Sequence, residues 1–234
     1  MKRFYKEVSV SPSPGELSGF TVLLDGKPVK TPNRATLNLP NVPLAEAVAE
    51  EWREQGEKLH RQTMPLTRLA FAALDVVMAN RANVANEIVK YATSDLLCYR
   101  AEEPPDLVMR QACVWDPLLD WAAETYGARL EVGAGIRHVA QPPEAIAELE
   151  IAVSRYDEFE LAVLHTATSI TGSLILALAL AEEEVDAKEA FDAAMLDETF
   201  QSEKWGIDAE AEQRRRHLLS ELTAAERFLR LLSS

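Results

Sequence analysis

The sequence predicts an α+β fold, with a small N-terminal β unit over residues 1–42 and a mostly α-helical domain over residues 43–234. Three observations predict it. Apolar and polar residues alternate between turn signals in the first forty positions, and from Pro43 onward apolar residues recur at helical spacing. Residues 161–181 then carry no charged side chain over twenty-one positions, which predicts a buried central helix. Strands segregated from helices in this way are typical of the α+β class.

The N-terminal unit contains one strong hairpin signal and several weaker strand signals. Asp25-Gly26, placed between an apolar run at 20–24 and a second run at 28–30, predicts a two-residue type I′ hairpin. Residues 36–39 also alternate and are a candidate for a further strand. A β unit of this size buries little apolar surface alone, so we expect it to pack against the helices that follow.

Helical segments begin at Pro43, which lies in the first turn of the first helix behind Asn41, a side chain suited to the N-cap position. The expected helices cover residues 43–59, 64–78, 83–91, 105–126, 143–154, 161–181, 186–205 and 208–232. Gly127 ends the fourth of them, and Pro117 inside it is expected to bend it. A short strand or strand pair is expected over residues 130–139.

The uncharged run at 161–181 is long enough to cross a bilayer, but its composition argues against that. It contains His165 with several threonines and serines, and no Lys or Arg lies at either end, where a membrane span usually carries one. We therefore expect a helix surrounded by protein, approached closely by its neighbours at Ala167, Ser169, Gly172 and Ser173. His165 is expected to be a buried, hydrogen-bonded core side chain rather than a metal ligand or a catalytic base.

Composition and charge exclude several classes of partner. The net charge of −14 and the pI near 4.8 argue against nucleic acid and against anionic membrane surfaces. The first ten residues lack the apolar region of an export signal, so a cytoplasmic location is expected. Cys98 and Cys113 lie fifteen positions apart with no CxxC motif, and we expect both to be reduced, buried thiols.

The common catalytic and metal-binding motifs do not occur in the sequence. No two histidines are spaced i, i+4, there is no HExxH or GxSxG pattern, and Gly133-Ala-Gly135 lacks the third glycine of a dinucleotide-binding loop. The sequence therefore predicts a non-enzyme without cofactor or metal. Two alternatives stay open: an enzyme whose site is assembled from distant residues around His165 with Cys98 or Cys113, and a scaffold or adaptor with another partner.

The candidate binding site lies at the junction of the last two expected helices. An aromatic pair and several carboxylates gather there, and tryptophan is enriched at the centres of protein interfaces. The candidate partner-binding residues are Phe200, Glu203, Trp205, Glu210 and Glu212. A partner that fits them would have an apolar patch edged by Lys or Arg. The structural alternative is that Trp205 only fills the corner between the two helices.

Several short strings occur in a specific order and spacing. They are KRFY at 2–5, VLLDGKPVKTP at 22–32, AEEW at 49–52, MPLT at 64–67, SDLLCYR at 94–100, WDP at 115–117, TS at 168–169 with GS at 172–173, and FQSEKWG at 200–206. Through them the chain resembles a bacterial member of the ATP synthase assembly chaperones, the factors that bind the α subunit of the catalytic sector. The resemblance extends from about residue 2 to about residue 230.

The resemblance implies a function without catalysis. A chaperone of this family holds the newly made α subunit, covers the surface destined for the β subunit and releases it during assembly of the hexamer. An unassembled subunit exposes a large apolar interface, and covering such a surface prevents aggregation. The expected partner is therefore the α subunit of ATP synthase, with no nucleic acid bound and no membrane insertion.

Overall fold

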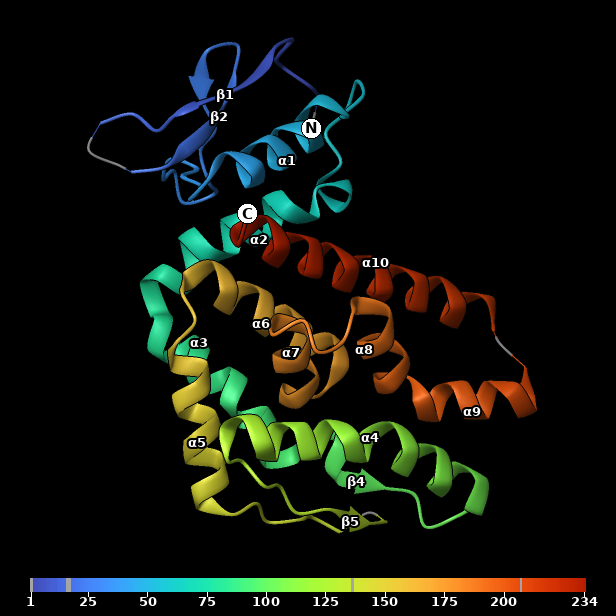
Figure 1. Cartoon of the computed structure of the whole chain (residues 1–234). Coiled ribbons are helices and arrows are strands. Elements are labelled where there is room, and N and C mark those ends of the chain that lie inside the picture. The colour runs from blue at the N-terminus through green and yellow to red at the C-terminus, as the bar shows by residue number, and fades with distance from the viewer. Residues whose placement is uncertain (1, 16–17, 136, 207) are drawn as a thin grey trace. The chain divides into compact units, whose positions relative to one another are not determined.

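The structure is a computed structural model that describes residues 2–15, 18–135, 137–206 and 208–234 (Figure 1). The chain forms two compact units, one made of residues 1–81, 157–163 and 227–234 and the other of residues 82–156 and 164–226. A small antiparallel sheet followed by helices confirms the predicted α+β class. The predicted β unit, residues 1–42, lies wholly in the first unit, which also takes in helices that the prediction assigned to residues 43–234.

The elements follow one another along the chain as strands β1 to β5, helices α1 to α10 and four short helical turns, η1 to η4. In order they are β1 (Val8–Pro12), β2 (Phe20–Leu24), β3 (Lys27–Pro28), α1 (Val42–Arg53), η1 (Arg61–Thr63), α2 (Pro65–Ala72), the π-helical η2 (Ala73–Val77), α3 (Met78–Lys90), η3 (Tyr91–Ser94), η4 (Leu96–Cys98), β4 (Tyr99–Arg100), α4 (Pro105–Tyr126), β5 (Gly133–Ala134), α5 (Pro143–Ser154), α6 (Glu158–Thr171), α7 (Leu174–Ala181), α8 (Ala187–Ala194), α9 (Leu196–Trp205) and α10 (Ala209–Leu232). Within the described ranges, none of the helices is both long enough and apolar enough to cross a membrane.

The first unit contains a three-stranded antiparallel sheet in the order β1-β2-β3. Asp25 and Gly26 both have positive φ, 47° and 77°, which confirms the predicted type I′ hairpin between β2 and β3. Residues 36–39, a candidate strand, form the isolated bridges Lys30↔Thr36 and Phe20↔Leu39 instead of a continuous strand. Helix α1 packs against β1 and β2, so the small sheet is supported by a helix as expected.

Asn41 confirms its predicted role as the N-cap of α1 and has a second role. Its Oδ1 accepts a hydrogen bond from the amide of Leu44 at 2.9 Å. Its Nδ2 donates to the carbonyls of Leu231 and Leu232 at 2.7 and 3.1 Å, which lie in the last turn of α10. The helix itself ends at Arg53, earlier than the expected 43–59. One side chain thus satisfies backbone groups at the start of α1 and at the end of α10.

The second unit is built around α7, which packs against α4 and α8 and whose residues 174–180 are all buried. The single helix predicted over 161–181 is wrong, because Gly172 and Ser173 divide the run into α6 and α7. Gly172 has φ +69° and ends α6, with its amide donating to the carbonyl of Thr168 at 2.8 Å. Ser173 begins α7, where its Oγ accepts from the amide of Leu176 at 3.0 Å.

The helix expected over 186–205 is two helices, α8 and α9, which meet at Met195. Asp186 caps α8, in a capping box with Glu189. Asp197 and Glu198 lie in the first turn of α9, where the helix dipole favours acidic side chains. By contrast, α4 and α5 begin and end where the sequence predicts, and α4 continues through its internal proline.

Two predictions of burial are wrong. The side chain of His165 is 45% exposed, and its Nε2 lies 3.8 Å from Oε2 of Glu87. Cys113 is also exposed, whereas Cys98 is buried, and both are free thiols. The uncharged run around His165 predicted burial on all sides, but only part of the surface of α6 is covered. An apolar run without periodicity does not indicate which face of its helix is left open.

Replacing Gly172 should destabilise the second unit through the backbone rather than through packing. A Cβ added at this position would meet only ordinary contact, because the nearest atom to it is Cβ of Leu96 at 3.9 Å. The left-handed backbone costs a residue with a side chain about 1–2 kcal/mol, so Gly172→Leu should lower the free energy of unfolding by about that amount. Gly172→Asn, which tolerates this conformation, should cost less. Denaturant unfolding measures both losses of free energy. Equal losses for the leucine and asparagine variants would contradict this explanation.

Candidate functional site

Trp205 is the most exposed large hydrophobic side chain among the residues that the structure describes, at 87%. It occupies the last position of α9, and Gly206 ends the helix with φ 85° and an amide that donates to the carbonyl of Ser202 at 2.9 Å. The side chain therefore does not fill the corner between α9 and α10. An indole exposed to this degree is available to a partner.

Phe200, five residues earlier in α9, is 5% exposed and has a different position. The guanidinium carbon of Arg110, in α4, lies 5.1 Å from the centre of its ring, and Nζ of Lys204 lies 4.3 Å from it. Cations over an aromatic face are stabilising at these distances. Phe200 thus packs α9 against α4 and leaves little of its ring for a partner.

The three candidate carboxylates are all exposed. Nη1 of Arg110 lies 2.9 and 2.8 Å from the two carboxylate oxygens of Glu203, and each of the two side chains is 49% exposed. Glu210 and Glu212 lie in the first turn of α10, where the helix dipole favours them. Oε1 of Glu212 is 3.8 Å from Nε of Arg216, an exposed pair. The structure thus brings Phe200 and Glu203 together around one arginine and leaves the other carboxylates on the surface.

The residues of the enzymatic alternative have ordinary structural environments. Burial raises the pKa of the Cys98 thiol to about 12, so the thiolate that a nucleophile needs is not formed near neutral pH. Cys113 is exposed on α4, and His165 faces Glu87. In the described part of the chain, no three or more His, Cys, Asp and Glu side chains gather in a group that could hold a metal ion.

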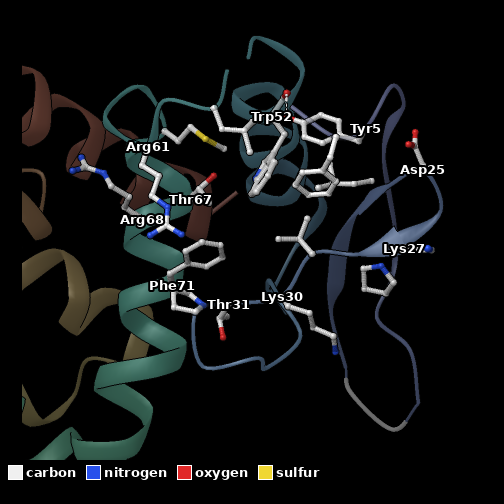
Figure 2. Close-up of a pocket in the computed structure, with 17 residues that line it drawn as sticks. Tyr5, Asp25, Lys27, Lys30, Thr31, Trp52, Arg61, Thr67, Arg68 and Phe71 are labelled. Atoms are coloured by element: carbon white, nitrogen blue, oxygen red, sulfur yellow. Dashed lines mark hydrogen bonds between the residues drawn. The ribbon is translucent and has the colours of Figure 1, made fainter. Parts of the chain in front are cut away.

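The first unit contains a cavity of about 970 Å³ that the sequence did not indicate (Figure 2). Its wall combines aromatic and aliphatic side chains with a rim of charged ones. Seventeen residues line it: Phe4, Tyr5, Leu24, Asp25, Lys27, Pro28, Val29, Lys30, Thr31, Pro32, Trp52, Leu59, Arg61, Met64, Thr67, Arg68 and Phe71. The strings at 2–5, 22–32, 49–52 and 64–67 all contribute to this wall. These strings could have indicated a site, but only the tertiary fold shows that they meet in one cavity.

Trp52 and Tyr5 form one side of the cavity. Their ring centres lie 5.8 Å apart, and the hydroxyl of Tyr5 donates to the carbonyl of Trp52 at 2.7 Å. Arg3 ties the same N-terminal segment to the end of α1 by donating to the carbonyls of Arg53, at 3.4 Å, and Gln55. Burial raises the pKa of Tyr5, although the charge of Arg3 acts in the opposite direction. These contacts hold the aromatic wall in place.

A buried carboxylate positions α2 on the other side of the cavity. Glu51, 7% exposed, accepts hydrogen bonds from the amide of Leu66 at 2.7 Å and from the amide and hydroxyl of Thr67 at 2.8 and 2.6 Å. Burial raises its pKa, while the three donors and the charge of Arg227 act in the opposite direction. Glu51 thereby caps the start of α2, the helix that carries Phe71.

Comparison with known proteins shows similarity along the whole chain. The model of the family described as ATP12 chaperone protein matches residues 2–123. The chain is 23% identical over 217 residues to protein atp12, mitochondrial, of Schizosaccharomyces pombe, covering 88% of this chain and 74% of the relative. The crystal structure of Atp12 from Paracoccus denitrificans is 40% identical, with a TM-score of 0.92 and coverage of 99% and 98%. A candidate chaperone from Agrobacterium tumefaciens is 45% identical, with a TM-score of 0.94 and coverage of 99% and 86%.

Proposed function

Because this chain belongs to the ATP12 chaperone family, we propose that it binds the unassembled α subunit of ATP synthase and assists assembly of the catalytic hexamer. It would do so without catalysis, in the cytoplasm of a bacterium. The family match and the likeness to Paracoccus Atp12 support the chaperone function. The α subunit as the partner comes from the sequence strings that carry the resemblance.

The observation that carries this proposal is the exposure of Trp205 on α9. A single indole that is 87% exposed, close in sequence to the exposed carboxylates Glu203, Glu210 and Glu212, combines an apolar anchor with negative charge. A subunit interface that awaits its neighbour offers the complementary surface, an apolar patch with Lys or Arg at its edge. The chain's net charge of −14 would also favour encounter with a basic surface.

The test is capture of isolated α subunit by purified chaperone. Trp205→Ala should weaken capture about 30-fold, because loss of an interface hot spot costs about 2 kcal/mol. Changing Glu203, Glu210 and Glu212 together to glutamine should weaken capture about 10-fold at low salt and make it less sensitive to salt. Thermal unfolding should hardly change in either variant, since the exposed pair between Glu203 and Arg110 contributes less than about 1 kcal/mol.

Matched controls make comparable changes on α5: loss of one exposed apolar side chain and loss of three exposed carboxylates. Ile151→Ala trims an exposed apolar side chain, 48% exposed. Changing Glu144, Glu148 and Glu150 together to glutamine alters net charge by the same amount at three exposed positions. Both controls should capture the α subunit as the wild type does. If the α9–α10 variants protect the α subunit from aggregation as well as these controls across salt concentrations, the partner does not dock there. If wild type captures no α subunit, the partner is another protein.

A further inference from the structure

The surroundings of the cavity in the first unit differ in charge from the rest of the chain. Residues 1–40 carry six Lys and Arg against three Asp and Glu, a net charge of +3, in a chain whose net charge is −14. Ten of the seventeen residues that line the cavity lie within residues 1–32. A basic region attracts anionic ligands, whereas the rest of this strongly acidic chain attracts cationic ones.

The floor of the cavity is apolar and partly open to solvent. Phe4 is 64% exposed and Phe71 is half-buried, whereas Trp52 is 9% exposed. Figure 2 shows Arg61 and Arg68 on the side of η1 and α2, Lys27 and Lys30 on the side of the strands, and Trp52 between the two sides. The volume of about 970 Å³ lies at the upper end of the range for ligand pockets, about 300–1,000 Å³.

Three of the cationic side chains on the rim are available to pair with an anionic ligand. Among the described residues, no carboxylate lies within ion-pair distance of Lys27, Lys30 or Arg61, and all three side chains are exposed. The acidic residue in the wall, Asp25, is already engaged. Its Oδ1 accepts from the amides of Lys6 and Glu7 at 3.0 and 2.8 Å, and these hydrogen bonds lower its pKa. The net charge presented around the mouth is therefore positive.

One buried donor in the wall lacks an acceptor. Nε1 of Trp52 is inaccessible to solvent and has no hydrogen-bond partner among the described residues. A buried indole N–H usually finds an acceptor, and leaving one unsatisfied costs free energy. The atoms around the indole close this N–H off from the cavity, so an acceptor from a ligand would reach it only if those side chains shift.

We propose that the cavity binds an extended, acidic peptide segment that places an aromatic or large aliphatic side chain against Trp52 and Phe71 and carboxylates near Lys30 and Arg61. That this segment belongs to the client of the chaperone rests on the proposed function. The chemistry of the segment does not rest on that function, because it comes from the apolar floor and the basic rim of the cavity. This site is separate from the α9–α10 surface, whose acidic rim selects a basic patch.

Synthetic fluorescein-labelled peptides test the proposal without the α subunit. One probe carries two phenylalanines flanked by aspartates. A second replaces the aspartates with lysines, and a third replaces the phenylalanines with alanines. Fluorescence anisotropy with the full chain should show the first probe binding about 10-fold more tightly than either of the others, with an affinity that falls as salt rises. Equal affinity for the aspartate and lysine peptides would overturn the proposal.

Variants locate the binding. Lys30→Glu with Arg61→Glu should reverse the preference, so that the lysine peptide binds more tightly than the aspartate peptide. Phe71→Ala should weaken the aspartate peptide about 10-fold. The control, Lys90→Glu with Arg129→Glu, makes the same charge change at exposed positions outside the cavity and should retain the wild-type preference. A cooperative thermal unfolding transition would show that each variant is folded. Binding that these cavity variants leave unchanged would also overturn the proposal.

The outcomes separate this inference from the proposed function. Peptide binding with the expected preferences, together with failure to capture α subunit, would support the cavity site and contradict the proposal that the α subunit is the client. If no peptide binds and the Lys30 and Arg61 variant captures α subunit as wild type does, the cavity site is contradicted. The proposal that the α subunit is the client would then still stand. A fluorescent anionic naphthalene sulfonate that binds the cavity while the peptides do not would make it a small-molecule site, and would also overturn the peptide proposal.

Discussion

Trp52→Arg should give a protein that is insoluble or unfolded. Trp52 is 9% exposed, packs against the ring of Tyr5 and forms part of the join between α1 and the N-terminal segment. Removing a buried indole costs about 3–5 kcal/mol. Burying a guanidinium without a partner adds a further penalty, and the sum approaches the whole stability of a typical domain, about 5–15 kcal/mol. The soluble fraction after expression and the circular dichroism of any soluble protein measure the effect.

Trp205→Arg is the matched control, because it makes the same chemical change at an indole that is 87% exposed. It should change the free energy of unfolding by no more than about 0.5 kcal/mol. Trp52→Phe keeps an aromatic ring next to Tyr5 and should remain folded with intermediate stability. A soluble Trp52→Arg protein with the melting temperature of wild type would place Trp52 on the surface and reopen it as a contact residue.

Asp95 should make the second unit less stable as the pH rises from about 4 to about 7. Its carboxylate is fully buried, with Oδ1 accepting from the amide of Leu97 at 3.0 Å and Oδ2 from the amide of Ile175 at 3.1 Å. Burial raises its pKa from 3.8 to about 6, although these donors act in the opposite direction. Because the folded state holds the proton more tightly, the contribution of Asp95 to stability is fully present below the pKa of the unfolded state. It is lost as the pH rises through the pKa of the folded state. The loss between pH 4 and pH 7 is about 2 kcal/mol.

The measurement is the free energy of unfolding of wild type relative to Asp95→Asn at each pH. That difference should fall by about 2 kcal/mol from pH 4 to pH 7, whatever the absolute cost of asparagine, which cannot accept both amides. Asp120→Asn, an exposed position on α4, should show no such trend. A difference that is flat with pH would mean that Asp95 does not hold its proton more tightly in the folded state.

The local signals in the sequence were sufficient where breakers and caps mark an element. Pro105 and Gly127 bound α4, and Asn41 and the Asp25-Gly26 turn have the roles that their chemistry predicts. Gly172 and Ser173 were equally good signals for a break, but the long apolar run around them outweighed them in the prediction. Met195 separates α8 from α9 without a glycine or proline, so nothing local marked that boundary.

The candidate sites could be predicted only in part, for a physical reason. The exposed Trp205 and its neighbouring carboxylates lie within a short stretch, so their gathering is visible in the sequence. Phe200 in the same stretch is buried because Arg110 and Lys204 cover it, and the contribution from α4 is not visible locally. The cavity depends on Tyr5 meeting Trp52, forty-seven residues apart, and on Glu51 capping the start of α2. Such long-range pairings have no periodicity to reveal them.

The two hydrogen bonds from Asn41 to the carbonyls of Leu231 and Leu232 have a consequence for synthesis on the ribosome. Residues 1–81 of the first unit are translated early, but residues 227–234, which complete it, emerge only after the intervening 145 residues. At about 5–20 residues per second, this delay is roughly 7–30 s. During that time the second unit has all its residues available before the first, so we infer that the N-terminal part of this chain is the last to reach its native packing.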